Sequence, residues 1–428
     1  MRDVYLDWIA VGADPTDPAT RELIRRGIPP MAGGAQQPAG ATIATRPQPQ
    51  TTVQPQGPGP FVAHAVHSSR PAYSRAAVAL GGIVTDPLPQ APGYLRKIRL
   101  ALLGSGGAGA GAVGTADSIV SVANVVQLLQ LKDPMGTPIL TGSGFDMLHL
   151  APLFSGQYGI LRAADPTLYP TYQTVQGTGG GFFIDAMIPL EGTLAYGLVA
   201  VGNASALPTL LLNINTAGGF FATPPATTNP SVTVTAEYDY FAVADPTVEP
   251  PGLGTTFQWQ SSPANPTIGS AASMRVQLPR TAGYLHTLVL VCRDSTGARV
   301  DGYGTRIRLY VDGVPLYDDS FGTAAAASSW ALDRMFLESG GNIGIAGTPP
   351  TTRPTGVVAY SWRESIAQVN LGLADTQLRL PPITPGTLLE VECTPWGSTG
   401  TPPYTLSALF GMCVPRGGLV TGLPQEGV

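Results

Sequence analysis

Residues Leu88–Leu95 read LPQAPGYL and residues Leu278–Leu285 read LPRTAGYL, so a string of the form LPxxxGYL returns after 190 positions. Each copy opens a run rich in apolar residues. Five residues held at one spacing favour a duplication over a chance match. We infer that the chain contains one structural unit twice.

Other paired strings follow the motif in the same order. They are GTPIL at 136–140 with GVPLY at 313–317, SG at 155–156 with SG at 339–340, and two expected short apolar helices, Phe145–Phe154 and Trp330–Leu337. The offsets differ from pair to pair, so the loops differ in length while the element order holds. Each expected copy has about 165 residues, an ordinary domain size. This period is too long for a solenoid or propeller repeat.

The composition predicts a folded chain with many turns. Its 428 residues include 53 glycines and 42 prolines, and 43% of the residues are hydrophobic, which is enough to bury two cores. Charged residues make up 12% and the formal net charge is −5. This balance gives no general attraction to nucleic acid, so direct contact with a genome is not expected.

The cysteines and the N-terminus bear on the cellular compartment. Cys292, Cys393 and Cys413 show no metal-ligand spacing and are interpreted as buried thiols, compatible with folding in a reducing cytoplasm. The first eight residues are interrupted by acids and lack the apolar core of a signal peptide. No apolar run reaches the roughly 20 residues of a membrane span.

The alternation of apolar and polar residues predicts strands of period two. It is clearest over Ser231–Tyr240. Further strands are expected at 94–103, 182–188, 196–201, 210–214, 284–291, 306–311, 357–362 and 389–393. Turn residues separate them, and only about one helix is expected in each copy. The predicted fold class is therefore all-β: two tandem antiparallel β-sandwich (jelly-roll) domains, each with a short helix, preceded by an N-terminal helix and an extended arm.

Composition shifts suggest the domain boundaries. Asp17, Pro18 and Gly27 bracket a short helix over Ala19–Arg26, and residues 27–60 form a stretch rich in Pro and Gln that cannot bury a core of its own. The expected division is 1–85 for the N-terminal helix and arm, 86–246 for the first jelly roll, 247–256 for a linker, 257–415 for the second jelly roll, and 416–428 for a C-terminal tail.

Nothing in the sequence indicates an active site. The GxGxxG string Gly104–Gly109 follows a predicted strand, but no apolar helix comes after it, so a hairpin loop is the preferred interpretation over a dinucleotide site. His64 and His67 lack further ligands for a metal, while His149 and His286 have no nucleophile at motif spacing. We predict no catalytic, cofactor-binding or metal-binding residues. Arg293, Asp294 and Arg299 are expected to form ion pairs at a domain edge.

The chain resembles the double jelly-roll major capsid proteins of tectivirus-like, tailless bacteriophages. The residues that carry the resemblance are the two LPxxxGYL strings, Ile188–Glu191, Glu237–Phe241 and Arg293–Arg299. It would extend over about residues 1 to 420. The resemblance implies two upright eight-stranded jelly rolls, a homotrimer that forms a pseudo-hexagonal capsomer, and an icosahedral shell, commonly with a lipid membrane beneath it.

The resemblance also implies partners and a location. The partners are further copies of the chain in the trimer and in neighbouring capsomers, penton and minor capsid proteins, and an internal viral membrane. The location is the virion capsid, reached from the host cytoplasm. Residues expected to contact either the membrane or a neighbouring capsomer are Tyr5, Leu6, Trp8, Ile9, Arg21, Arg25 and Arg26.

Two other functions remain open at this point. A phage receptor-binding or spike protein, or a minor capsid protein, would use the same β-sandwich architecture without requiring the repeat. A secreted two-domain hydrolase would need a convergent acidic or metal site and an export signal, and neither is visible. Gly104–Ala116 and Gly341–Thr355 are candidates for outward-facing loops.

Overall fold

The structure is a computed structural model that describes residues 65–113, 122–155, 172–173, 179–191, 197–203, 205–243, 255–262, 265–268, 274–279, 283–325, 328, 354–362, 382–384, 386–394, 396–397 and 399–415. By compactness the chain divides into residues 1–57 and 58–428, and every described residue belongs to the second unit. The helix expected at Ala19–Arg26, the helix expected at Trp330–Leu337 and the tail 416–428 lie outside the described residues.

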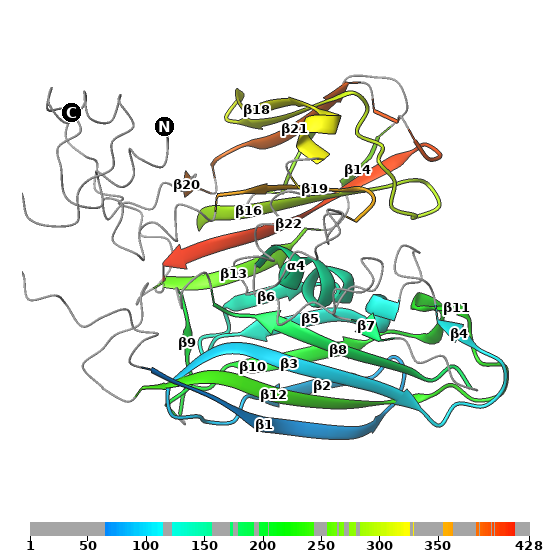
Figure 1. Cartoon of the computed structure of the whole chain (residues 1–428), viewed down its shortest axis with the longest axis vertical. Coiled ribbons are helices and arrows are strands. Elements are labelled where there is room, and N and C mark those ends of the chain that lie inside the picture. The colour runs from blue at the N-terminus through cyan, green and yellow to red at the C-terminus, as the bar shows by residue number, and fades with distance from the viewer. Residues whose placement is uncertain are drawn as a thin grey trace, which may run out of the picture. The chain divides into compact units, whose positions relative to one another are not determined.

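Eight strands make up the first jelly roll, which is drawn in Figure 1. They are β1 (Ala65–Val78), β2 (Ile83–Pro87), β3 (Tyr94–Ser105), β5 (Val126–Lys132), β6 (Pro138–Gly142), β8 (Phe182–Pro189), β10 (Thr209–Ile214) and β12 (Ser231–Val243). They form one sheet in the order β1-β12-β3-β8 and a second in the order β6-β5-β10-β2. All these neighbours are antiparallel.

Eight further strands repeat this arrangement. They are β13 (Thr255–Ser261), β15 (Met274–Gln277), β16 (Gly283–Arg293), β17 (Arg306–Val311), β18 (Val314–Ser320), β19 (Val357–Ser361), β21 (Leu389–Thr394) and β22 (Tyr404–Pro415). Their sheets run β13-β22-β16-β19 and β15-β21-β17-β18. Numbered within each roll, the strands fall in the orders 1-8-3-6 and 2-7-4-5 in both copies, which is the jelly-roll topology.

Short elements complete the described residues. The strands are β4 (Ala112–Val113), β7 (Tyr172–Gln173), β9 (Val199–Ala200), β11 (Phe221–Thr223), β14 (Asn265–Ile268) and β20 (Pro382–Ile383). The helical segments are η1 (Val122–Val125), η4 (Ala217–Gly219) and a continuous pair, η2 (Asp146–Leu150) with α4 (Ala151–Ser155). The η2–α4 pair confirms the helix expected at 145–154. In the second roll, residues 321–325 are helical at the corresponding place after β18.

One sheet joins the two rolls. Strand β13 pairs in parallel with β6, Trp259 opposite Leu140 and Gln260 opposite Thr141, and the sheet then runs β19-β16-β22-β13-β6-β5-β10-β2. The second roll encloses its own core, which includes Leu288, Leu290 and Val391. Other side chains of β16, β19 and β22 belong instead to the core of the first roll. Sheet β13-β22-β16-β19 is therefore buried on both faces.

The LPxxxGYL string has the same structural role in both copies. Gly93 (φ 131°) and Gly283 (φ 144°) adopt positive φ, and a Cβ on Gly93 would lie 2.0 Å from the carbonyl oxygen of Phe241. The first residues of the strings, Leu88 and Leu278, both donate their backbone N–H to the chain at the start of the seventh strand.

A β-bulge follows the string in each roll. Arg96 is skipped in the pairing of β3 with β12, and His286 is skipped in the pairing of β16 with β22. These residues occupy matching positions, because both follow the final Leu of the string. The duplication inferred from the sequence therefore reaches the detail of strand register.

The start of the first roll differs from the prediction. Strands β1 and β2 fall inside the segment 1–85 that was assigned to an arm, yet β1 pairs along most of its length with β12, and β2 pairs with β10. β1 is an edge strand with exposed or half-buried residues and Pro71 at its centre, so its sequence lacks the alternation of a half-buried strand. β13 begins at Thr255, inside the expected linker 247–256.

Candidate assembly surfaces

A row of ion pairs covers the outer face of the sheet β1-β12-β3-β8. Arg99 lies opposite Glu237 on β12 and Met187 on β8, so these three side chains share one face. The Arg99 guanidinium donates to both carboxylate oxygens of Asp185, with Nε 2.8 Å from Oδ1, and Nη1 lies 3.9 Å from Glu237 Oε2. The Arg99 side chain is 58% exposed, so the row faces solvent in the isolated chain.

Asp239 on β12 contacts basic side chains of β3 and the imidazole of His67 on β1. Lys97 Nζ lies 2.9 Å and Arg96 Nη1 lies 3.9 Å from its carboxylate, and His67 on β1 pairs with the same group. Arg96 also donates to Glu191, with Nε 2.6 Å from Oε1. We call His67, Arg96, Lys97 and Asp239 the charged cluster.

An aromatic cluster lies at the corresponding place in the second roll, where Phe257, His286 and Gly411 match His67, Arg96 and Asp239. The His286 ring stacks on Phe257 with centroids 3.9 Å apart and meets Trp259 edge-on at 5.2 Å. Gly411 leaves room for the imidazole, because a Cβ there would lie 2.2 Å from His286 Cε1. Phe257, Trp259 and His286 are buried. We call Phe257, Trp259, His286 and Gly411 the aromatic cluster.

The helix η2–α4 of the first roll contacts the second roll at its first turn. Two guanidinium groups lie over the Phe145 ring, with Arg299 Cζ at 4.3 Å and Arg293 Cζ at 5.3 Å from its centroid. Ser261 Oγ on β13 donates to Asp146 Oδ2 at 2.6 Å. These contacts fix the first roll against the second through both charge and packing.

His149 lies inside this helix and is buried. Its ring lies 5.2 Å from that of Phe145. Burial removes the water that would solvate an imidazolium, and the positive charge of Arg299 acts in the same direction, so the pKa of His149 lies well below its usual value of 6.5. The imidazole is therefore neutral at pH 7.

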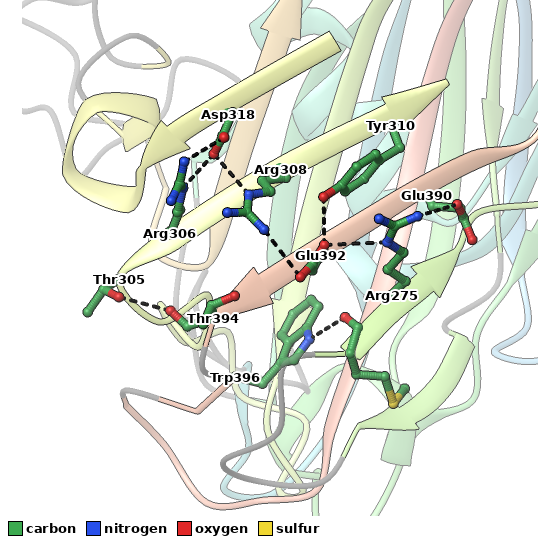
Figure 2. Close-up of polar contacts among 11 residues, drawn as sticks. Arg275, Thr305, Arg306, Arg308, Tyr310, Asp318, Glu390, Glu392, Thr394 and Trp396 are labelled. Atoms are coloured by element: carbon green, nitrogen blue, oxygen red, sulfur yellow. Dashed lines mark hydrogen bonds and ion pairs between the residues drawn. The ribbon is translucent and has the colours of Figure 1, made fainter. Parts of the chain in front are cut away.

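A second charged face belongs to the sheet β15-β21-β17-β18, as Figure 2 shows. Arg306 donates two hydrogen bonds of 2.5 Å to the Asp318 carboxylate on β18. Arg308 bridges Asp318, at 3.0 Å, and Glu392 on β21, at 3.4 Å. The hydrogen bond from Arg306, assisted by Arg308, holds the pKa of Asp318 below its usual range.

The network continues to the far edge of the same sheet. Tyr310 Oη donates to Glu392 at 2.7 Å, and Arg275 Nε donates to the same oxygen at 3.4 Å (Figure 2). Arg275 also lies over the Tyr310 ring at 3.9 Å and 3.7 Å from Glu390. Strands β15, β17, β18 and β21 are thus tied together on their outer side by charged and aromatic groups.

The expected contact residues Tyr5, Leu6, Trp8, Ile9, Arg21, Arg25 and Arg26 lie outside the described residues. The loop expected at the GxGxxG string is present. Gly104 is the last residue but one of β3. The loop that follows is held by hydrogen bonds from Ala108 N to Thr228 O at 2.9 Å and from Gly179 N to Gly109 O at 3.0 Å. These contacts tie the loop to neighbouring loops of the first roll.

The cysteines are free and buried, which confirms the interpretation of Cys292, Cys393 and Cys413 as core thiols. Burial raises the pKa of Cys292 to about 12 and raises those of the other two as well. Within the described ranges, no group of three His, Cys, Asp or Glu side chains is arranged to hold a metal ion. No described helix is long and apolar enough to cross a membrane.

Asp294 was expected to form ion pairs, but the contacts described for its carboxylate are hydrogen bonds. Its carboxylate accepts hydrogen bonds from the backbone N–H groups of Thr296, Ala298 and Thr401 and from the Thr296 hydroxyl. Asp294 therefore organises a turn, as Asp residues commonly do. The charged cluster was not predicted from the sequence, although Asp239 lies among the polar residues of the alternating strand Ser231–Tyr240, and Arg96 and Lys97 lie in another predicted strand.

Comparison with known proteins concerns the fold. No family model and no curated protein matches the chain. Among solved structures it is similar to VP54 of PBCV-1, with 10% identity, 82% of this chain and 93% of that chain covered, and a TM-score of 0.52. It is also similar to the major capsid protein of Sulfolobus turreted icosahedral virus, with 14% identity, coverage of 82% and 97%, and a TM-score of 0.50. The chain has the double jelly-roll fold of these viral capsid proteins.

Proposed function

We propose that the chain is the major capsid protein of an icosahedral virus and forms homotrimers whose six jelly rolls make a pseudo-hexagonal capsomer. The observation that carries the proposal is the complete duplication of an eight-stranded jelly roll with one sheet continuous across both copies. The fold shared with viral major capsid proteins supports it.

The structure of the two rolls suits a building block that is used in many copies. The joint between the rolls is made by backbone pairing of β6 with β13 and by buried apolar side chains, so the rolls are held as one body. The described outer faces carry balanced ion pairs rather than a field of one sign. Such faces limit repulsion between copies packed side by side.

Finer parts of the proposal concern the particle. We place the chain in a tectivirus-like, tailless bacteriophage, folded in the host cytoplasm and then incorporated into the virion capsid. Its partners there are neighbouring capsomers, penton proteins and minor capsid proteins. The N-terminal residues Tyr5, Leu6, Trp8, Ile9, Arg21, Arg25 and Arg26 contact either an internal membrane or a neighbouring capsomer.

The native mass of the purified protein tests the proposal. Light scattering on a size-exclusion column should give about three times the chain mass of 44.3 kDa, and electron microscopy of the same sample should show compact particles of hexagonal outline. A stable monomer at all concentrations would overturn the capsomer and leave the receptor-binding or minor capsid alternative.

A further inference from the structure

Two of the edge strands among the described residues, β1 and β18, have counterparts in the other roll that are paired inside the chain. β1 is the first strand of the sheet β1-β12-β3-β8, and β18 is the last strand of the sheet β15-β21-β17-β18, as Figure 1 also shows. Within the rolls their counterparts are β13 and β6, which pair with each other inside the chain. Edge strands present free N–H and C=O groups and readily accept another strand.

The register of that internal joint can be transferred to the free edges. Trp259 lies opposite Gly411, and Ser69 lies opposite Asp239 at the matching position of β12, so Ser69 corresponds to Trp259 and Arg70 to Gln260. On the other strand, the pairing of the strings at 136–140 and 313–317 makes Tyr317 correspond to Leu140 and Asp318 to Thr141.

The cap of the following helix supports this alignment independently. Ser143 Oγ accepts the backbone N–H of Asp146 at 3.2 Å, and Ser320 Oγ accepts the backbone N–H of Thr323 at 3.1 Å. Ser143 comes directly after β6 and Ser320 is the last residue of β18, and the two serines keep the offset of 177 positions found between the strings. The alignment therefore holds from the turn before β6 and β18 to the helix after them.

The two free edges carry opposite charges. The charged residues of β1 are basic, Arg70 and Arg75, and those of β18 are acidic, Asp318 and Asp319. The internally paired strands β6 and β13 contain no charged residue. Like charges disfavour pairing of β1 with β1 or of β18 with β18, whereas β18 with β1 remains favourable.

Exposed apolar residues lie on the edge strand β18. Val314 is 66% and Leu316 is 42% exposed at the beginning of β18. A free, partly apolar edge strand promotes aggregation unless a partner covers it. The prolines at Pro315 and Pro71 limit how far a ladder can extend, because proline donates no hydrogen bond. The internal joint is equally short, with two paired residues that follow Pro138.

We propose that β18 of one copy pairs in parallel with β1 of a second copy, Asp318 beside Arg70 and Tyr317 beside Ser69, and so repeats between chains the joint that β6 and β13 make within the chain. The inference rests on the proposed function, since it names the contact that builds the capsomer. A contact between two different surfaces is heterologous and closes into a ring when its rotation allows. Repetition of one roll-to-roll step around three chains gives six rolls.

Asp318 already binds Arg306 and Arg308 in the single chain. Arg70 therefore joins an existing network and contributes mainly to the choice of partner. Backbone pairing and coverage of the apolar end of β18 supply the rest of the attraction. In the single chain the Arg70 guanidinium donates to the backbone carbonyl of Gln90, and this bond would be exchanged on assembly.

Disulfide cross-linking tests the register. In the double variant R70C/D318C the two cysteines of neighbouring copies should lie close enough for a disulfide, and mild oxidation should give a covalent trimer on a non-reducing gel. The matched control R70C/L316C moves one cysteine two residues along β18, roughly 6.5 Å away, and should cross-link far less. The three native cysteines are buried, so the parent chain should give no cross-link.

Charge reversal provides a second test that does not depend on disulfide geometry. R70E or D318R alone should raise the concentration needed for assembly at least about tenfold, whereas R70E/D318R together should restore it. R275E, at the opposite edge of the sheet β15-β21-β17-β18, should leave assembly unchanged. Thermal melts of each variant identify any that has lost its fold.

The outcomes distinguish a failure of the proposed contact between β18 and β1 from a failure of the proposed trimeric capsomer. Cross-linking at 318 but not at 316, with rescue by the paired reversal, supports the contact. A trimer by mass that neither cross-links at 318 nor responds to R70E overturns the contact and leaves the proposed function standing. A parent chain that stays monomeric overturns both.

Discussion

The third strands of the two rolls, β3 and β16, begin near the end of the same string and differ in what covers their outer face. Their core positions match: Ile98 and Leu100 correspond to Leu288 and Leu290, and all four are fully buried. On the other face, Arg99 corresponds to Val289. Arg99 pairs with Asp185 in solvent, whereas Val289 is buried in the core shared with the first roll.

The strands beside β3 and β16 show the same difference between a charged and an apolar outer face. Opposite Arg99 lie Glu237 and Met187, and opposite Val289 lie Leu409 and Ala359. The charged cluster and the aromatic cluster extend the contrast to the bulge after the string. Duplication thus preserved the inside of each roll, while the outer face of the second roll became apolar where the first roll covers it. The two faces therefore offer matched positions at which similar substitutions should differ in their effect on stability.

The largest effect is expected from a charge placed under the first roll. V289D removes apolar packing and buries an unpaired carboxylate, and should lower the free energy of unfolding by about 4 kcal/mol or more. R99D at the matching position should cost less than about 1 kcal/mol, because exposed ion pairs contribute little. Chemical denaturation measures both variants. Equal losses would mean that the two faces do not differ in burial.

Truncation of Phe145, which packs between the two rolls, should cause the next largest loss in the free energy of unfolding. F145A removes a buried ring that lies under Arg293 and Arg299 and should cost about 3–4 kcal/mol. F321A, at the start of the corresponding helix in the second roll, removes a half-buried ring and should cost about 1–2 kcal/mol. Denaturant midpoints compare the two. A larger loss for F321A would contradict the assignment of Phe145 to the joint.

The glycines of the repeated string should differ in how much they tolerate a side chain. A Cβ on Gly93 would meet the Phe241 carbonyl oxygen at 2.0 Å, whereas a Cβ on Gly283 would first meet the Val414 side chain at 2.9 Å. Both positions have positive φ, so both alanine variants should be destabilised, G93A by about 2–3 kcal/mol and G283A by about 1–2 kcal/mol. Thermal unfolding tests the order, and a neutral G93A would exclude the close approach.

The smallest effect is a pH dependence that arises at the joint. The folded pKa of His149 lies below its unfolded value, first because of burial and then because of Arg299. The unfolded chain therefore binds an extra proton below about pH 6.5, so this stabilisation is complete above that pH and is lost as the pH falls. The loss should reach about 1.4 kcal/mol at pH 5.5. H149Q removes this titration and should flatten the slope measured between pH 7.5 and 5.5, and an unchanged slope would contradict the neutral, buried state.

Much of the fold followed from local patterns. The sequence located β3, β8, β10, β12 and β21, and alternation is clearest in β12 and β21, where polar and apolar residues divide between two faces. Alternation failed at β1, an edge strand with little burial on either side, and that strand was assigned to the arm. Residues 196–201 were predicted as one strand, whereas within the described residues 197–201 the strand β9 comprises Val199–Ala200.

The assembly surfaces were harder to predict because they depend on which rolls meet. β16 is apolar almost throughout, a sign of burial on both faces, yet the sequence does not say what covers its second face. The pairing of β6 with β13 leaves no local signal in either strand. The charged cluster joins residues from β1, β3 and β12, which only the jelly-roll topology brings together.

Electron cryo-microscopy of the purified oligomer, at a resolution that traces strands, would show how the jelly rolls of neighbouring copies meet. We expect three copies with six jelly rolls in one ring, each β18 beside β1 of the next copy and each aromatic cluster buried within its own chain. Isolated monomers, or an oligomer that is not built from rings of jelly rolls, would contradict this expectation.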